Sequence, residues 1–313
     1  MSHPLKIVFM GTPDFAVPSL RALIDSDHEV AAVVCQPDRQ RGRGKVLSPP
    51  PVKVLAGEHN LPVLQPGSVR TDEFFEQLRT IAPDLLVVVA YGKILPVRLL
   101  QLPRLGAINV HGSILPKYRG AAPIQWAVIN GEAESGITIM QMDAGMDTGD
   151  ILLIERTPIG PQETAGELFD RLSAMGGATL VAAVDQLAAG GLTRQPQDHA
   201  RATTAPMLTK EMGHIDWNLP ARKLQSLIRG LDPWPSAYGF IEGKRYRFFH
   251  PEVVPIRATG EPGTICRADA QGLLVATGED CLLLREIQPE GKKRMEVASC
   301  LRGTPIPPLV RID

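Results

Sequence analysis

Apolar and polar positions follow two different periods along the first half of the chain. The runs KIVFMG, VAAVVC, DLLVVVA and AINVH are short, apolar and rich in β-branched residues, whereas PSLRALIDS and EFFEQLRTI between them have helical spacing. Strands that alternate with helices are joined by crossover connections, which produce a mostly parallel sheet buried on both faces. The pattern therefore predicts an α/β domain.

The pattern changes toward the second half. GITIMQM and ILLIERTPI are typical of strands, and ELFDRLSAMGGATLVAAVDQLAAG is typical of a long amphipathic helix that ends at a glycine. Residues 190–209 lose this periodicity and collect Gly, Pro and Thr, as linkers do. Beyond them, one helix precedes closely spaced short strands, which predict a small antiparallel barrel or sandwich. We expect a first domain of residues 1–189, a linker of residues 190–209 and a second domain of residues 210–313.

Composition and charge narrow the class of protein. A length of 313 residues with 44% apolar content fits two globular domains better than one. The formal charge of -1 excludes a generally basic nucleic-acid coat protein, so a polyanionic partner must meet a local patch. The four cysteines have neither metal-ligand spacing nor the density of a disulfide scaffold. With no signal peptide and no apolar run of about 18 residues, we expect a cytoplasmic protein without membrane contact.

Candidate chemistry begins in the segment AINVHGSILP. Asn109 and His111 share one face of a predicted strand at its carboxyl end, which is where an open parallel sheet binds ligands. The alternative is a hydrogen-bonded core histidine beside a turn-forming asparagine. Asp143, Asp147 and Asp150 lie in MDAGMDTGD, where a neighbouring strand of the same sheet is expected to end. An aspartate there can reach the histidine, whereas the spacing does not match a calcium loop, so we expect no metal.

An asparagine, a histidine and an aspartate suit the attack of a substrate amine on a carbonyl carbon. The amide donates a hydrogen bond to the developing oxyanion, a protonated imidazole adds positive charge, and the carboxylate orients the imidazole and accepts the amine proton. Ser113 offers an alternative as a hydrolase nucleophile, but it lacks the glycine-flanked G-x-S-x-G elbow, because His111 and Leu115 stand where the two glycines would be.

The segment CQPDRQRGRGKVLSPPPVK forms a local basic patch. Between Gln36 and Pro50, four basic residues against one acidic residue leave a net charge of +3. GRGK lacks the first glycine and the final Ser or Thr of a P-loop, and GTPDF is not the G-x-G-x-x-G dinucleotide motif. Several guanidinium groups on one segment suit a nucleic-acid backbone or groove, and a solvated loop is the alternative interpretation.

Longer motifs carry a family resemblance. NVHGSILPKYRGAAPIQWAVINGE followed by GITIMQMDAGMDTGDIL resembles the formyltransferases that use 10-formyltetrahydrofolate. FMGTPDFAVPSL, QPDRQRGRGK, VVVAYGKILP, IDW and DPWPSAY narrow the resemblance to the methionyl-tRNA formyltransferase family. The likeness covers about residues 5 to 300, with SILP where the family usually has SLLP. It implies a Rossmann-like, mostly parallel sheet domain followed by a small β-barrel domain similar to an oligonucleotide-binding fold.

The resemblance also assigns roles to residues. It implies that Asn109, His111 and Asp147 are catalytic. It implies folate contacts in two segments, Ser113, Ile114, Leu115 and Pro116 in one and Ala90, Tyr91, Gly92, Ile94 and Leu95 in the other. It implies contacts with the tRNA acceptor stem by the basic segment through Arg39, Arg41, Gly42, Arg43 and Lys45, with Arg43 most prominent.

The function implied by the resemblance is transfer of a formyl group from the cosubstrate 10-formyltetrahydrofolate to the α-amine of methionyl-initiator tRNA by a monomer. Two alternatives stay open at this point. A formyltransferase acting on a small amine, such as glycinamide ribonucleotide or an amino sugar nucleotide, would keep the catalytic trio without needing the basic segment or the barrel. The other is a non-catalytic RNA-binding protein built on a decayed α/β domain, against which the intact trio argues.

Overall fold

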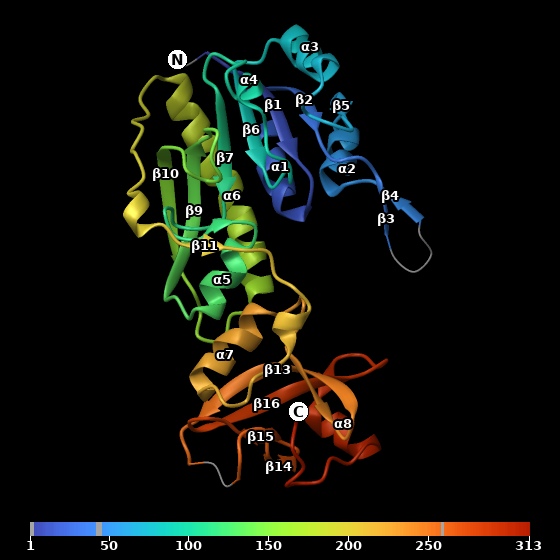
Figure 1. The fold of residues 1–313 in the computed structure, drawn as a ribbon. Coiled ribbons are helices and arrows are strands. Elements are labelled where there is room, and N and C mark those ends of the chain that lie inside the picture. Colours follow the sequence, from blue (N-terminus) through green and yellow to red (C-terminus); the bar gives the residue numbers. More distant parts are fainter. Residues whose placement is uncertain (1–2, 42–45, 258–259) are drawn as a thin grey trace. The chain divides into compact units, whose positions relative to one another are not determined.

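The structure, a computed structural model, describes residues 3–41, 46–257 and 260–313. The chain divides into two compact units (Figure 1). The first contains the chain up to Gly120 with Ser135–Thr157 and Phe169–Thr204, and the second contains Ala121–Glu134, Pro158–Leu168 and Ala205–Asp313. Two short segments from before residue 189 therefore pack with later residues. The predicted boundaries at residues 189/190 and 209/210 stay a prediction.

A seven-stranded sheet in the order β10-β9-β7-β6-β1-β2-β5 forms the centre of the first unit. Its strands are β1 (Lys6–Gly11), β2 (Glu29–Val34), β5 (Val63–Leu64), β6 (Leu85–Val89), β7 (Ala107–His111), β9 (Glu134–Gln141) and β10 (Ile151–Pro158). The five strands from β7 to β5 in this order pair in parallel, whereas β9 runs antiparallel to β7. The predicted mostly parallel α/β fold is therefore confirmed.

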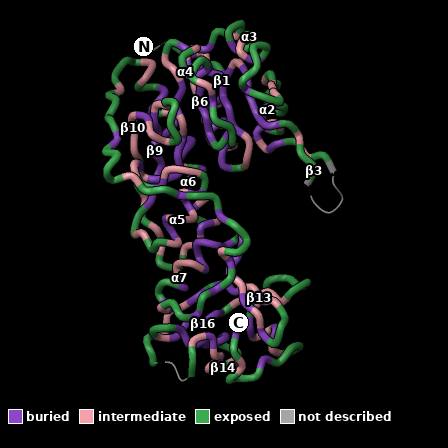
Figure 2. Tube along the Cα trace, viewed as in Figure 1, coloured by how far each residue is buried: buried purple, intermediate pink, exposed green. Residues whose placement is uncertain are grey.

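Helices accompany this sheet, and their ends follow local sequence signals. The helical segments of this unit are η1 (Asp14–Ala16), α1 (Val17–Ile24), α2 (Pro51–Glu58), α3 (Asp72–Ile81), α4 (Val97–Leu100), η2 (His199–Arg201) and α6 (Ala165–Ala188), which belongs to this unit from Phe169 onward. Thr71 caps α3, because its side-chain oxygen accepts a hydrogen bond from the Phe74 N–H at 3.3 Å. All five residues of β6 are buried, and Figure 2 shows the central strands as buried. This burial on both faces explains why their sequences are continuously apolar.

The basic segment starts and ends in a short antiparallel hairpin. Its strands are β3 (Arg39–Arg41) and β4 (Val46–Ser48), with Arg39 opposite Ser48 and Gln40 opposite Leu47. Residues 42–45, which include three of the predicted tRNA contacts, lie outside the described residues. Two further short strands, β8 (Arg119–Gly120) and β11 (Thr204–Ala205), form a separate two-stranded sheet.

The second unit is built on a curled antiparallel sheet in the order β12-β13-β16-β15-β14, with β17 beside β16. The strands are β12 (Tyr238–Ile241), β13 (Lys244–Val254), β14 (Ile265–Asp269), β15 (Gly272–Ala276), β16 (Cys281–Pro289) and β17 (Met295–Glu296). The last residues of the chain link its two edges, because Ile312 pairs with Ile241 and Arg311 pairs with Thr264. This link confirms the predicted barrel-like domain and covers edge strands that would otherwise expose unpaired backbone groups.

Helical segments of the second unit are α5 (Pro123–Ile129), η3 (Glu211–Gly213), α7 (Ala221–Gly230) and α8 (Val297–Gly303). The buried face of α7 contributes Leu224 and Ile228 to a core that also contains Phe248. At the end of α7, a Cβ atom on Gly230 would lie 2.4 Å from Ile129 Cγ1, so glycine permits the close approach of α5. Among the described residues, no helix combines the length and apolar character needed to cross a membrane.

Candidate active site

Polar groups join the ends of three parallel strands in the first unit. The Tyr91 carbonyl, two residues after β6, accepts hydrogen bonds from Thr12 Oγ1 at 3.2 Å and Gln36 Nε2 at 3.3 Å. Thr12 follows β1 and Gln36 follows β2, so one carbonyl ties together the ends of three neighbouring strands. Ala90 and Gly92 have positive φ angles of 46° and 82°, which turn the chain sharply after β6. This edge of the sheet is where an α/β domain binds ligands.

Asn109 and His111 lie on β7, the next strand of the same parallel set. His111 is 5% exposed, and its Nε2 lies 2.9 Å from the Tyr118 carbonyl oxygen. Asn109 is partly exposed, and within the described part of the chain its side-chain amide makes no hydrogen bond. The imidazole is therefore held from one side, while the amide has its hydrogen-bonding capacity available.

Asp147 reaches His111 from the loop between β9 and β10. Its Oδ2 lies 3.7 Å from His111 Nδ1 and accepts a 2.8 Å hydrogen bond from the Gly120 N–H. The neighbouring strand is β9, as expected, but it is antiparallel: its last residue, Gln141, pairs near the start of β7, and Thr138 pairs with His111. The loop must therefore return along the sheet to bring the carboxylate to the imidazole.

The other two aspartates of this loop have different surroundings. Asp143 Oδ1 accepts hydrogen bonds from the Gly145 N–H at 2.9 Å and Thr148 Oγ1 at 2.6 Å, so this carboxylate stabilises the turn. Asp150 pairs through its carbonyl with the Gln141 N–H. In residues 3–41, 46–257 and 260–313, no group of three or more His, Cys, Asp and Glu side chains is placed to hold a metal ion.

The turn after β7 contains the four predicted folate contacts that begin at Ser113. The hydroxyl of Ser113 donates to the Lys117 carbonyl at 2.7 Å, and its carbonyl accepts from Thr138 Oγ1 at 2.6 Å. Ser113 and Leu115 are buried, whereas Ile114 and Pro116 are partly exposed. Ser113 thus supports the turn, and its hydroxyl bonds to a backbone carbonyl rather than to His111, which disfavours the serine hydrolase interpretation.

The second predicted folate segment combines exposed and buried residues. Ala90, Gly92 and Ile94 are exposed, with Ile94 at 68%, whereas Tyr91 and Leu95 are buried. Burial raises the pKa of Tyr91 to about 12, so its hydroxyl stays protonated at neutral pH. The side chain of Ile94 is thus apolar and exposed, while Tyr91 and Leu95 anchor the segment in the core of the first unit.

The described part of the basic hairpin presents one of the predicted tRNA contacts to solvent. Arg39 is exposed, and Arg41 is described only through its backbone in β3. Asp38, the acidic residue of the patch, lies 2.9 Å from Lys53 Nζ and accepts a 2.8 Å hydrogen bond from Gln65. These hydrogen bonds, first from Gln65 and then from Lys53, hold the pKa of Asp38 below its ordinary value. Gly42, Arg43 and Lys45 lie outside the described residues.

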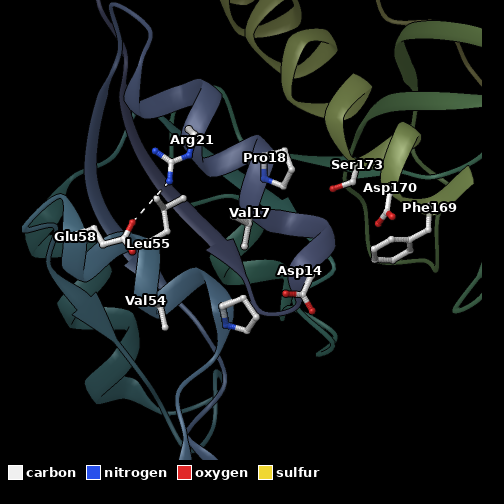
Figure 3. Close-up of a pocket in the computed structure, with 11 residues that line it drawn as sticks. Asp14, Val17, Pro18, Arg21, Val54, Leu55, Glu58, Phe169, Asp170 and Ser173 are labelled. Carbon is white, nitrogen blue, oxygen red and sulfur yellow. Dashed lines mark ion pairs between the residues drawn. The ribbon is translucent and has the colours of Figure 1, made fainter. Parts of the chain in front are cut away.

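An open pocket of about 500 Å³ lies elsewhere in the first unit, between α1, α2 and the start of α6 (Figure 3). Arg21 and Glu58 form an ion pair of 3.7 Å across one side of it, and Phe169 and Asp170 face them from α6. None of the predicted site residues lines this pocket. Its position is therefore distinct from the group formed by His111 and Asp147.

Sequence patterns did not reveal three contributors to the site. The Tyr118 carbonyl contacts His111, and the Gly120 N–H donates to Asp147. Both are backbone groups, so the identity of the residue does not predict their role. Gln197 donates to the Asp147 carbonyl from a segment interpreted as a linker. Loss of periodicity was its only signal, and that signal does not distinguish a linker from a segment that crosses the site.

Family models match both parts of the chain. Residues 5–184 match the family described as formyl transferase, and residues 207–305 match the C-terminal domain of formyl transferases. Together with an α/β sheet and an antiparallel barrel-like sheet, these matches define the class of protein: formyl transferases that carry a separate C-terminal domain.

Close relatives narrow the class. The methionyl-tRNA formyltransferase of Desulfotalea psychrophila is 60% identical over 96% of this chain and 94% of its own length. That of Geobacter sulfurreducens is 51% identical over 98% of this chain and 96% of its own length. The chain belongs to the methionyl-tRNA formyltransferase family.

A more distant solved structure shares the fold. An N-formyltransferase from Helicobacter canadensis, solved in complex with folinic acid and dTDP-3-aminofucose, is 16% identical with a TM-score of 0.68. The match covers 93% of this chain and all of that one. At this identity the likeness concerns the fold alone.

Proposed function

We propose that this protein transfers the formyl group of 10-formyltetrahydrofolate to the α-amine of methionyl-initiator tRNA, giving N-formylmethionyl-tRNA for translation initiation. Membership of the methionyl-tRNA formyltransferase family supports the acceptor. Folinic acid, a formylated tetrahydrofolate bound to the Helicobacter canadensis enzyme, is consistent with the donor. The observation that carries the chemistry is the placement of His111 between the Tyr118 carbonyl and the Asp147 carboxylate, two residues beyond an unengaged amide.

The arrangement suits stabilisation of an oxyanion. His111 Nε2 faces a carbonyl oxygen and therefore carries a proton, because only a donor makes that contact favourable. Its Nδ1 faces the Asp147 carboxylate at 3.7 Å, which is an ionic contact and too long for a hydrogen bond. A proton on Nδ1 is thus not committed to a hydrogen bond with Asp147 and is available to a substrate oxygen that lies in the plane of the ring. Asn109 adds a second donor from the same face of β7.

In this proposal Asp147 is the base that accepts the proton lost by the amine. An α-amine has an ordinary pKa of about 8, so a useful fraction is neutral at cytoplasmic pH and attacks without prior help from a strong base. The new C–N bond leaves an ammonium beside an oxyanion. Asp147 accepts the ammonium proton directly or through water, the bond from the formyl carbon to N10 of the folate breaks, and N10 takes up a proton.

The rest of the chain supplies the macromolecular contacts in this proposal. The exposed Arg39 and the basic residues at 41, 43 and 45 approach the acceptor stem, and the barrel-like unit meets the phosphate backbone. Segments 90–95 and 113–116 hold the folate. The protein acts as a monomer in the cytoplasm, with no metal in the reaction.

Formyl transfer to different acceptors tests this function. Purified protein with 10-formyltetrahydrofolate is offered methionyl-initiator tRNA, uncharged initiator tRNA, free methionine, glycinamide ribonucleotide and an amino sugar nucleotide. We expect product only with the charged tRNA, because the other acceptors lack either the aminoacyl amine or the stem. Preferential formylation of a small amine would replace the proposal by the small-amine alternative, and no transfer to any acceptor would favour the RNA-binding alternative.

A further inference from the structure

Gln197 is fully engaged at the back of the candidate site. Its side chain is 6% exposed, and Nε2 donates to the Asp147 carbonyl at 2.9 Å and to the Gly149 carbonyl at 2.7 Å. Its Oε1 accepts from Arg119 Nε at 3.1 Å and Nη2 at 2.6 Å. A neutral amide is the only common side chain that offers two donors and an acceptor in this arrangement.

These bonds connect the two sides of the catalytic carboxylate. Arg119, which Gln197 holds, directly precedes Gly120, and the Gly120 N–H donates to Asp147 Oδ2. Gln197 therefore fixes the backbone of Asp147 and also the segment that grips its carboxylate. His199 Nδ1 lies 3.0 Å from Arg119 Nη2 and extends the same network.

The neighbouring residues form what we call the strap, residues 195–203. At its start, the backbone of Gln195 exchanges two hydrogen bonds with Ile151, where the catalytic loop ends. At its end, Thr203 accepts from the Arg119 N–H through its carbonyl and from the Tyr118 N–H through Oγ1. Since the Tyr118 carbonyl contacts His111 Nε2, the strap supports both oxygen atoms that flank the imidazole.

The catalytic loop needs such support because its own residues provide little. Asp147 has a positive φ of 54°, Met146 is 63% exposed, and the side-chain hydrogen bonds of Asp143 to described residues lie within the turn. A loop of this kind is expected to move unless contacts with the surrounding structure fix its conformation. The buried Gln197 amide provides such contacts through its hydrogen bonds to the Asp147 and Gly149 carbonyls.

We propose that Gln197 is a positioning residue, which holds Asp147 at working distance from His111. This inference rests on the catalytic roles proposed above. It goes beyond them because it gives a residue of the predicted linker a role in positioning Asp147. The specific requirement is for a donor at Nε2. A carboxylate in its place would put negative charge against two carbonyl oxygens while still accepting from Arg119.

The isosteric variant Gln197→Glu tests this requirement. We expect kcat for formyl transfer to methionyl-initiator tRNA to fall on the order of 10- to 100-fold, because displacements of about 1 Å at a reacting group have effects of this size. KM for both substrates should change little. Relative to wild type, activity should recover as the pH is lowered, since a protonated carboxyl regains one donor. Gln186→Glu on the exposed face of α6 is the matched control and should retain wild-type kinetics.

A double-mutant cycle with Asp147→Asn separates this inference from the proposed function. If Gln197 acts through Asp147, adding Gln197→Glu to Asp147→Asn should cost less than threefold further in kcat. Multiplicative losses, or a Gln197→Glu variant with wild-type kcat, would overturn the positioning role while leaving the site intact. Full activity of Asp147→Asn alone would instead remove the catalytic role of Asp147, on which this inference rests, and absence of formyl transfer by the wild-type protein would remove the proposed function. Equal thermal unfolding of wild type and Gln197→Glu shows that the loss is catalytic, and an unfolded variant with no pH recovery would count against the inference.

Discussion

At the scale of single residues, the site is made by backbone groups as much as by side chains. The Tyr118 carbonyl sets the orientation of the His111 ring, and the Gly120 N–H sets that of the Asp147 carboxylate. These contacts leave the Asn109 amide free of hydrogen bonds within the part of the chain that the structure describes. Asn109 is therefore the side chain whose removal should affect the transition state with the least disturbance of the fold.

For Asn109→Ala we expect kcat to fall by about 100- to 1,000-fold, which is typical of losing one donor to an oxyanion. The affinity for methionyl-initiator tRNA should stay close to that of wild type, because the amide serves a charge that develops only during the reaction. Single-turnover kinetics and equilibrium tRNA binding measure the two quantities separately. A comparable loss in both would assign Asn109 to binding.

At the scale of elements, the direction of one strand changes how the site is assembled. Parallel strands would bring their carboxyl ends to one edge, but β9 is antiparallel to β7, so its end lies away from His111. The carboxylate arrives only because the following loop returns. Neighbouring parallel strands, in contrast, have their starting residues side by side. Asp84, just before β6, accepts through Oδ2 a 2.8 Å hydrogen bond from the N–H of Lys6, the first residue of β1.

Asp84 also contacts Arg104 Nε at 2.6 Å. The backbone hydrogen bond from Lys6, with a smaller contribution from Arg104, holds the pKa of Asp84 below its ordinary value of 3.8. A lowered pKa in the folded state means that the stabilisation is complete above the unfolded value and is lost as the pH falls through the folded value.

We therefore expect Asp84→Asn to lower the free energy of unfolding by about 2 kcal/mol at neutral pH. The difference from wild type should shrink as the pH falls below 3.8. Urea unfolding and hydrogen exchange of the Lys6 amide measure it, with the exposed Asp27→Asn as a control. A difference that is constant with pH would show that the ionised carboxylate is not the stabilising form.

At the scale of the whole molecule, charge is local rather than general. The chain has a formal charge of -1, yet the segment of β3 and β4 carries a net charge of +3 between Gln36 and Pro50. Asp38, the acidic residue there, pairs with Lys53 outside the hairpin, which leaves the exposed Arg39 without a competing carboxylate in that segment. A partner with a phosphate backbone is attracted to such a patch even when the net charge of the protein is slightly negative.

For Arg39→Ala we expect weaker binding of initiator tRNA and a salt dependence whose slope is smaller by about 1, because one phosphate contact releases about one counterion. Binding measured across a series of salt concentrations gives the slope. Arg70→Ala, at an exposed position of the first unit, serves as the matched control and should leave the slope unchanged. An unaltered slope in Arg39→Ala would remove this residue from the interface.

The sequence by itself determined the fold class, because the spacing of apolar residues within a segment favours a helix or a strand there whatever the distant parts of the chain do. It also indicated Asn109, His111 and the loop of Asp143, Asp147 and Asp150 through residue type and position relative to strand ends, and the family resemblance selected Asp147 among the three. The tertiary structure alone decided that β9 is antiparallel, that the chain end closes the barrel, and that Gln197 supports Asp147. Each of these depends on hydrogen bonds between residues far apart in the sequence. The spacing of apolar and polar residues within one segment does not specify which distant segment it pairs with, or in which direction.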